Sequence, residues 1–259
     1  MLRNYLKIAL RNLLRNKTFS FLNILGLTTG TVCCLYILIY VKEQFGFDAH
    51  HIKAENIYRL RTYIEFGNDE PVVNTSTVSP VIAPTMKKDF AEVQEYTRVL
   101  NFFTSKATII GAEGKTETFA EDKGYLVDST FFKVFSYRFV EGSPEHSLDA
   151  PYTAVLSTKI AQKLFGSEKA LNKRIKIGNN VNTSTFTVTG VYDETYGKSH
   201  LNPTFLVSLN SGGLGEFARS STEWGGNNFM YAYVKLNPNA NPAKLEAKLP
   251  AFLTLYQHG

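Results

Sequence analysis

An uncharged and mostly apolar run lies near the start of the chain. Residues 18–41 carry no charged side chain and stand between Lys17 and Lys42. A helix that crosses the hydrocarbon core of a bilayer needs about 20 predominantly apolar residues. The pattern therefore predicts a transmembrane helix over residues 18–45.

A cleaved signal peptide is the alternative for this run. Its apolar region would extend over only about 7 to 15 residues and would end in a small-x-small site. Here the run is longer, and residues 40–45, at its C-terminal end, have bulky and charged side chains instead of small ones. The sequence favours an uncleaved anchor, followed by one large domain on the far side of the membrane.

The charges differ on the two sides of the run. Basic residues without any acid precede it, namely Arg3, Lys7, Arg11, Arg15 and Lys17. Because basic flanks stay in the cytoplasm, we expect the N-terminus there and the chain from about residue 46 outside. Residues 43–259 hold 22 basic and 23 acidic residues, a net charge of −1. The positive charge of the whole chain thus comes from its start and does not indicate a nucleic-acid partner.

Residues 2–15 have the pattern of an amphipathic helix. Its basic residues recur at every fourth position, and leucines fill the other side, at Leu2, Leu6, Leu10, Leu13 and Leu14. Such a helix lies on a membrane surface with its apolar side in lipid. Each Lys or Arg near anionic lipid contributes about 1 kcal/mol of attraction. Residues 1–17 are therefore predicted to form an interfacial helix on the cytoplasmic side.

Small residues within the run predict a face for helix packing. Gly26 and Gly30 stand one helical turn apart, a spacing that lets a second helix approach closely. Incidental small residues are the alternative, because glycine is common in membrane helices. Cys33 and Cys34 are the two cysteines of the chain, and we interpret them as small apolar residues rather than a redox or metal pair.

After residue 46, short strand-like and helix-like segments alternate. Strands are predicted at 57–66, 93–103, 107–111, 116–119, 125–127, 153–156, 174–177, 185–192, 204–209 and 229–236. Helices are predicted at 79–90, 129–135, 158–165 and 241–253, with Asp128 and Ser157 as N-caps and Gly166 as a stop. Strands outnumber helices without a regular crossover pattern. This predicts an α+β domain with mainly antiparallel or mixed sheets.

Candidate chemistry is weak throughout. Residues 111–116 end like a phosphate-binding loop, but two residues instead of four separate the first glycine from the Gly-Lys pair, so a hairpin turn is predicted. His50 and His51, with Asp48 and Glu55 nearby, could supply metal ligands, but adjacent side chains point apart, so solvated or capping roles are predicted for them. His200 lacks a nucleophile elbow, and we expect it to form structural hydrogen bonds. Trp224 is predicted either to form the contact tip of an exposed loop or to cover an edge of the hydrophobic core. No catalytic, cofactor-binding or metal residue is predicted.

Four stretches resemble one family in their order and spacing. FDAHH and NIYRL lie within residues 47–60, directly after the predicted span, and VDSTFFKVF with Glu141-Gly142 lies within 127–142. AVLS with LFG follows within 154–166, and VTGVY with SHL within 188–201. Together they resemble MacB-like ABC transporter permeases, the FtsX-type group, in a form close to permeases common in the Bacteroidetes.

The resemblance implies a permease subunit rather than an enzyme. In such permeases, a cytoplasmic ATPase dimerises on ATP, and the movement passes through the first span to a periplasmic domain, for export or mechanotransmission. It implies a bacterial inner-membrane location, ATP on a separate ABC ATPase subunit, a permease dimer partner and a periplasmic or outer-membrane partner. The basic face of residues 3–17 would contact lipid or the ATPase. Residues 46–259 would form a MacB-like periplasmic core domain, a porter-like part with an insert at roughly 121–204.

The chain also departs from the family. MacB proper carries its nucleotide-binding domain ahead of the first span, and the family has three further spans after the periplasmic domain. We therefore expect a truncated fragment or the product of a degenerate gene. The alternative function is a single-span, membrane-anchored sensor or ligand-binding module outside the cytoplasm. It is disfavoured because about 17 residues inside leave no room for a signalling domain.

Overall fold

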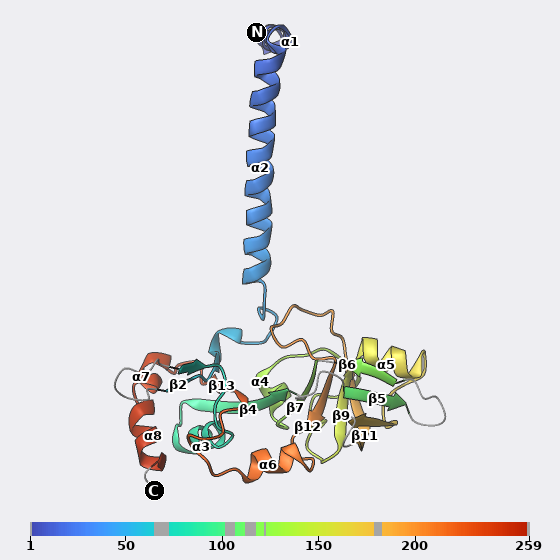
Figure 1. The fold of residues 1–259 in the computed structure, drawn as a ribbon, viewed down its shortest axis with the longest axis vertical. Helices are drawn as coiled ribbons and strands as arrows, with labels where there is room; N and C mark the ends of the chain where they lie inside the picture. Colours follow the sequence, from blue (N-terminus) through green and yellow to red (C-terminus); the bar gives the residue numbers. More distant parts are fainter. Residues whose placement is uncertain are drawn as a thin grey trace. The chain divides into compact units, whose positions relative to one another are not determined.

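The computed structural model describes residues 2–64, 73–101, 107–111, 118–121, 123–178 and 183–257. They belong to two compact units, Met1–Phe47 and Asp48–Gly259. The first unit is helical, and the second is built around a β-sheet (Figure 1).

Two helices make up the first unit. Helix α1 spans Leu2–Arg15, and α2 spans Lys17–Phe45. Asn16 separates them, because its backbone leaves the helical region (φ −111°, ψ 59°) and its side chain forms no capping hydrogen bond. The 29 residues of α2 extend about 43 Å at 1.5 Å per residue. Within the described residues, α2 is the one helix long and apolar enough to cross a membrane.

A mixed sheet organises the second unit. Eleven strands of the described residues form it, in the order β1-β13-β4-β7-β12-β9-β11-β10-β5-β6, with β8 paired to β11. β7 pairs with β12 and β9 with β11 in parallel, and the other pairs are antiparallel. This arrangement confirms the predicted α+β class.

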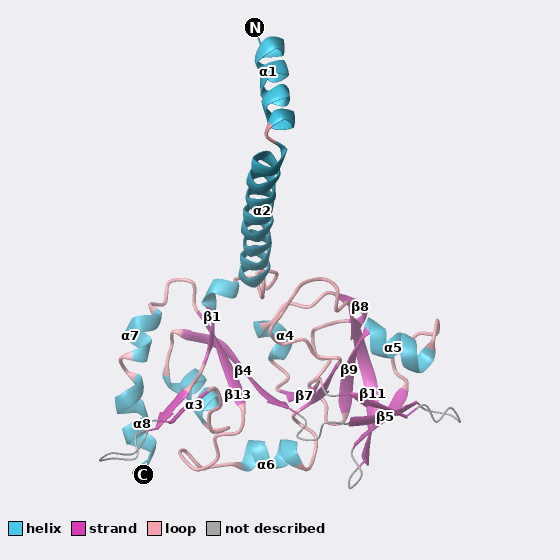
Figure 2. Cartoon of the chain, turned by 45° about the horizontal axis from the view of Figure 1, so that its top comes forward, coloured by secondary structure: helices cyan, strands magenta, loops and turns pink. Residues whose placement is uncertain are grey.

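The strand bounds are β1 Ile57–Arg59, β4 Val93–Asn101, β5 Ala107–Gly111, β6 Thr118–Glu121, β7 Gly124–Val127, β8 Phe139–Gly142, β9 Thr153–Ser157, β10 Arg174–Gly178, β11 Thr183–Tyr192, β12 Phe205–Ser208 and β13 Tyr231–Leu236. A separate hairpin-like pair consists of β2, Thr62–Ile64, and β3, Val73–Thr75. The helices are α3 Ile82–Asp89, α4 Phe131–Val134, α5 Thr158–Phe165, α6 Leu214–Ser220, α7 Pro242–Glu246 and α8 Leu249–Gln257, with the 3₁₀ helix η1 at Ala54–Asn56. In Figure 2, α5 lies at the end of the sheet near β9 and β11, and α7 and α8 lie at the opposite end.

Strand β9 separates two layers of the core. Its Ala154 and Leu156 belong to one buried cluster, which also contains Ile160 of α5. Val155 belongs to another, which also contains Phe131 of α4. Successive side chains of a strand point to opposite faces, so this strand is covered on both sides. All five of its residues are buried.

A third cluster fills the other end of the domain. Met86 of α3, Val234 of β13 and Phe252 of α8 pack together there. Trp224 stacks on Tyr256 of α8, with ring centroids 4.5 Å apart and planes 7° apart. Trp224 therefore covers a core edge rather than forming a contact tip.

The caps of α5 agree with the prediction. The Ser157 hydroxyl accepts a hydrogen bond from the backbone N–H of Ile160, and the helix ends at Gly166, which has a φ of +62°. A side-chain oxygen satisfies an unpaired N–H of the first turn, and glycine adopts positive φ at little cost.

Asp128 is not the predicted N-cap. Its carboxylate accepts hydrogen bonds from Nε and Nη2 of Arg98, at 2.9 and 2.8 Å, and from the Arg98 backbone N–H at 2.7 Å. Helix α4 begins at Phe131 without a side-chain cap. The bidentate pair with the guanidinium gives the Asp128 carboxylate two parallel charge-assisted hydrogen bonds and a cationic partner, where a cap would bond only a backbone N–H, which explains the difference.

Three segment predictions also need correction. Helix α6 occupies a stretch that we predicted as a Gly-rich bend; Gly215 lies inside it, where a Cβ would stand 2.4 Å from the Leu209 carbonyl oxygen. The predicted helix 241–253 is divided into α7 and α8. The predicted strand 57–66 is divided into β1 and β2, which belong to different sheets, and residues 65–66 lie outside the described set. The insert at 121–204 stays a prediction.

Candidate functional site

The basic residues predicted as a site lie on the helices of the first unit. Lys7, Arg11 and Arg15 are exposed on α1, and Lys17 is exposed at the start of α2. Arg3 lies in α1, and its side chain is outside the described set. The contact of this face with lipid or an ATPase stays a prediction.

The predicted packing face of α2 is open within this chain. A Cβ added at Gly26 or Gly30 would have no atom within 4 Å. None of the described side chains of α2 is buried. The glycine face is thus free for a second helix or for lipid, and its role stays a prediction.

Sequence reasoning missed a polar cluster of the second unit, which surrounds Asp48. Oδ1 of Asp48 accepts a hydrogen bond from the Ser199 hydroxyl at 2.5 Å and from the His200 backbone N–H at 3.1 Å. Its Oδ2 lies 2.7 Å from Nδ1 of His200. Nε2 of His200 lies 2.8 Å from the hydroxyl of Tyr233. The cluster therefore connects the first residue of the domain to β13, across 151 to 185 positions of sequence.

The electrostatics of Asp48 favour its charged form. Burial alone would raise the pKa of this carboxyl, but the Ser199 hydrogen bond and the His200 charge outweigh burial and hold the pKa below its ordinary value. Burial raises the pKa of Tyr233, so its hydroxyl stays protonated. Asp48 is therefore a charged carboxylate that accepts hydrogen bonds from Ser199 and His200.

His51 is buried beside Asp48, with 4% of its surface exposed. Its Nδ1 lies 3.1 Å from the backbone N–H of Ser136, which donates to it. Nδ1 also lies 3.2 Å from the Ser136 carbonyl oxygen, and Nε2 lies 3.4 Å from the Ser199 hydroxyl. Burial, together with the charge of His50, lowers the pKa of His51 to about 4. The prediction of solvated or capping histidines was wrong for His51, whereas His200 forms the hydrogen bonds expected of it.

The backbone around the cluster adopts unusual angles. Asp48 and Lys53 both have positive φ, 62° and 59°. Left-handed backbone costs about 1 kcal/mol or more at a non-glycine residue and persists where surrounding contacts hold it. At Asp48 those contacts include its backbone N–H, which donates to the Lys198 carbonyl at 2.8 Å.

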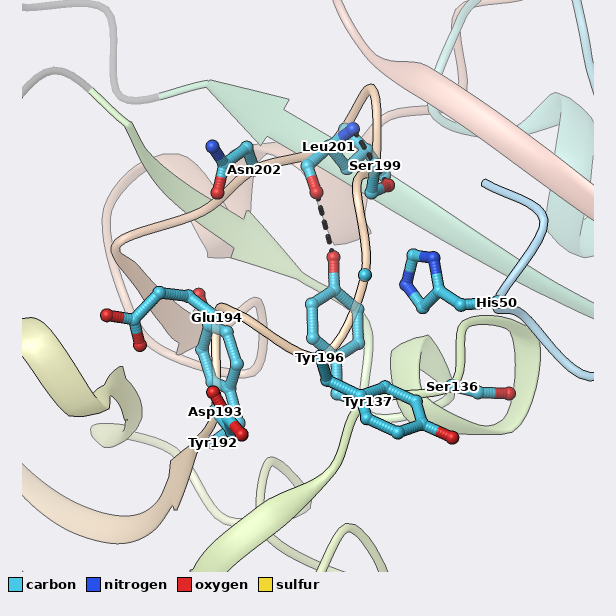
Figure 3. Close-up of a pocket in the computed structure, with 11 residues that line it drawn as sticks. His50, Ser136, Tyr137, Tyr192, Asp193, Glu194, Tyr196, Ser199, Leu201 and Asn202 are labelled. Carbon is cyan, nitrogen blue, oxygen red and sulfur yellow. Dashed lines mark hydrogen bonds between the residues drawn. The ribbon is translucent and has the colours of Figure 1, made fainter. Parts of the chain in front are cut away.

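Two cavities adjoin the cluster. An open cleft of about 370 Å³ is lined by Asp48, His51, Ala54, Ile57, Arg59, Phe135, His200 and Tyr233. A cavity of about 10 Å³ lies beside His50, near the lower limit for one water molecule. Figure 3 shows its lining, with the Tyr137 hydroxyl donating to the Leu201 carbonyl at 2.9 Å. Among the described residues, Nδ1 of His50 is buried without a hydrogen-bond partner.

The cluster is not arranged as a hydrolase site. A serine nucleophile needs a base that takes its proton. The Ser199 hydroxyl donates to the Asp48 carboxylate instead. The described part of the chain also places no group of three His, Cys, Asp or Glu side chains around a common metal position. The hydrogen bonds of the cluster hold together the segments that contain Asp48, His200 and Tyr233.

The loop predicted at 111–116 lies largely outside the described residues.

Comparison with known proteins identifies the family. The model of the MacB-like periplasmic core domain matches residues 20–252. The chain belongs to this family. It is a MacB-like chain of the ABC transporter permease type, and such chains are generally not enzymes themselves.

Solved structures have the same fold. A permease-protein domain from Porphyromonas gingivalis is 23% identical, with a TM-score of 0.59, and the match covers 78% of this chain and 81% of that one. The periplasmic region of MacB from Actinobacillus actinomycetemcomitans is 15% identical, with a TM-score of 0.53, covering 78% and 85%. No curated protein sequence matches the chain significantly. The MacB-like domain after one apolar helix indicates anchoring in a membrane.

Proposed function

We propose that this MacB-like chain transmits an ATP-driven conformational change across the bacterial inner membrane to its periplasmic domain, for export or mechanotransmission. A separate ABC ATPase subunit binds the ATP, and this chain holds no cofactor. The observation that carries the proposal is the attachment at Asp48. Helix α2 ends at Phe45, and three residues later a carboxylate is bound by Ser199 and His200.

The hydrogen bonds give a physical route for the movement. Bonds to a charged carboxylate are shorter and about twice as strong as neutral ones. They continue from His200 to Tyr233, and Tyr233 lies on β13 between β1 and β4. A displacement of residue 48 is therefore passed to a strand inside the sheet rather than absorbed by a flexible linker.

The first unit supplies the other contacts of the proposal. The basic face of Arg3, Lys7, Arg11, Arg15 and Lys17 binds inner-leaflet lipid and the ATPase side. The face of Gly26 and Gly30 packs against the permease dimer partner, because small residues allow close helix approach. A periplasmic or outer-membrane protein is the expected partner of the domain.

The coupling role can be tested by uncoupling residue 48. The full chain, reconstituted in nanodiscs with the ATPase of the same locus, is compared with Asp48→Asn and with the exposed control Glu145→Gln. We expect Asp48→Asn to keep ATP hydrolysis but to lose the ATP-dependent change in hydrogen exchange of β13. The control should keep both. An unchanged response in Asp48→Asn would refute the coupling role.

One observation favours the alternative of an anchored ligand-binding module, namely the cleft of about 370 Å³. Clefts of this size accommodate small molecules. A wild-type chain whose domain never responds to ATP, but binds a soluble ligand in this cleft, would support the alternative over the transmission role.

A further inference from the structure

The cleft beside Asp48 has a basic rim. Arg59 lines it, and Ile57 and Arg59 of β1 stand directly opposite Lys235 and Tyr233 of β13. Directly opposed residues of an antiparallel pair project from the same face. The face that forms the cleft therefore also carries Lys235.

Lys53 directly precedes Ala54, a residue that lines the cleft, and adds to this positive charge. Burial, together with the charge of Lys53, lowers the pKa of Lys235. The ammonium group of Lys235 donates a hydrogen bond to the Lys133 carbonyl at 3.1 Å. Over the described part of the chain, no carboxylate forms an ion pair with Lys53, Arg59 or Lys235. Asp48, the acid in the cleft, is already bound by Ser199 and His200.

The floor of the cleft is apolar. Ala54, Ile57 and Phe135 line it together with the ring of Tyr233. A basic rim above an apolar floor complements a ligand that carries an anionic group next to hydrocarbon. A fully hydrated inorganic anion would gain nothing from the floor.

Connectivity identifies the source of such a ligand. Asp48 follows Phe45, the last residue of α2, by three positions. An extended chain spans at most about 3.6 Å per residue, so Asp48 lies within roughly 11 Å of the end of α2. If α2 crosses a bilayer, lipid headgroups lie within reach of this part of the domain.

We propose that the cleft binds the headgroup of an anionic phospholipid, whose phosphate contacts Lys53, Arg59 and Lys235. Ile57 and Phe135 then face the glycerol and the first acyl carbons. This site fixes the start of the domain to the membrane surface. The proposal needs α2 to cross the membrane, as in the proposed function, but it does not need ATP coupling.

Photo-crosslinking in nanodiscs tests the site. The full chain is reconstituted with photoactivatable phosphatidylglycerol or phosphatidylcholine, and lipid adducts are mapped by mass spectrometry. We compare K53Q/R59Q/K235Q with the control K169Q/K176Q/K244Q, which removes three exposed lysines elsewhere. Each basic residue near anionic lipid contributes about fivefold to binding. Adducts of phosphatidylglycerol on residues 53–59 should therefore fall roughly 100-fold in the first variant and remain in the control.

Other outcomes overturn the proposal in distinguishable ways. Adducts on α2 without any on residues 53–59 would agree with a membrane-spanning α2 but would refute lipid binding in the cleft. Equal adducts with phosphatidylcholine would refute selection of anionic headgroups. Loss of adducts on adding soluble glycerol 3-phosphate would assign the cleft to a free phosphate ester rather than lipid. Arg59→Gln alone, expected to lower the adducts about fivefold, gives the same test should the triple variant fold poorly.

Discussion

The two units differ in what covers their apolar side chains. Leu27 in α2 is 75% exposed, whereas Leu156 in β9 is fully buried. The domain forms its core from its own strands and helices. The first unit leaves its apolar surface to be covered from outside the chain, which is what a membrane helix requires. The difference separates the part that is stable on its own contacts from the part that depends on lipid or a partner.

The largest effect is expected inside the domain, at the buried pair of Arg98 and Asp128. Arg98→Met leaves Asp128 without its guanidinium partner. Removing one member of a buried ion pair costs about 3–5 kcal/mol. Chemical denaturation of the full chain should show this loss in the free energy of unfolding of the domain. A loss below 1 kcal/mol would mean that the pair contributes little.

A matched pair of leucine substitutions tests the comparison directly. Leu156→Ala removes a fully buried side chain, which costs about 2–5 kcal/mol. Leu27→Ala removes an exposed one from α2 and should leave the unfolding of the domain unchanged. Equal losses in the two variants would contradict the division into independently covered units.

The stability of the domain should depend on pH through His51. Its pKa is about 4 in the folded state against 6.5 for a free histidine. The unfolded chain therefore binds more protons between these values, so stability is complete above pH 6.5 and falls as the pH is lowered towards 4. The loss is on the order of 3 kcal/mol. In His51→Asn, the free energy of unfolding measured across this range should lose most of its dependence on pH. An unchanged dependence would exclude His51 as its source.

The smallest effect on the domain is expected from the glycine face of α2. Gly26→Leu with Gly30→Leu should weaken association of the full chain by roughly tenfold, since close helix packing is lost, and should leave domain stability unchanged. Val32→Leu, which adds bulk on the opposite side of α2, is the control. Crosslinking through the native Cys33, two turns from Gly26, measures the association. Equal crosslinking in all three proteins would rule out this face.

Local patterns predicted much of the fold. The caps of α5 and the bounds of β5 follow from neighbouring residues, and both were predicted correctly. Asp128 was misassigned because its partner, Arg98, lies 30 positions away. The same reason hid the Asp48 cluster, since Ser199 and His200 reach it from 151 and 152 positions along the chain. Pairing over such distances depends on strand order, which a single sequence does not reveal.

The central claim is that α1 lies inside the cell and the domain outside, with α2 crossing between them. Its most direct test uses a chain in which Cys33 and Cys34, the native cysteines, are replaced by alanine. One cysteine is then placed in α1 by Asn12→Cys or in α6 by Glu216→Cys, both at exposed positions. A membrane-impermeant maleimide applied to intact cells should label the α6 variant and should label the α1 variant only after permeabilisation. Labelling of both variants, or of neither, in intact cells would contradict the account.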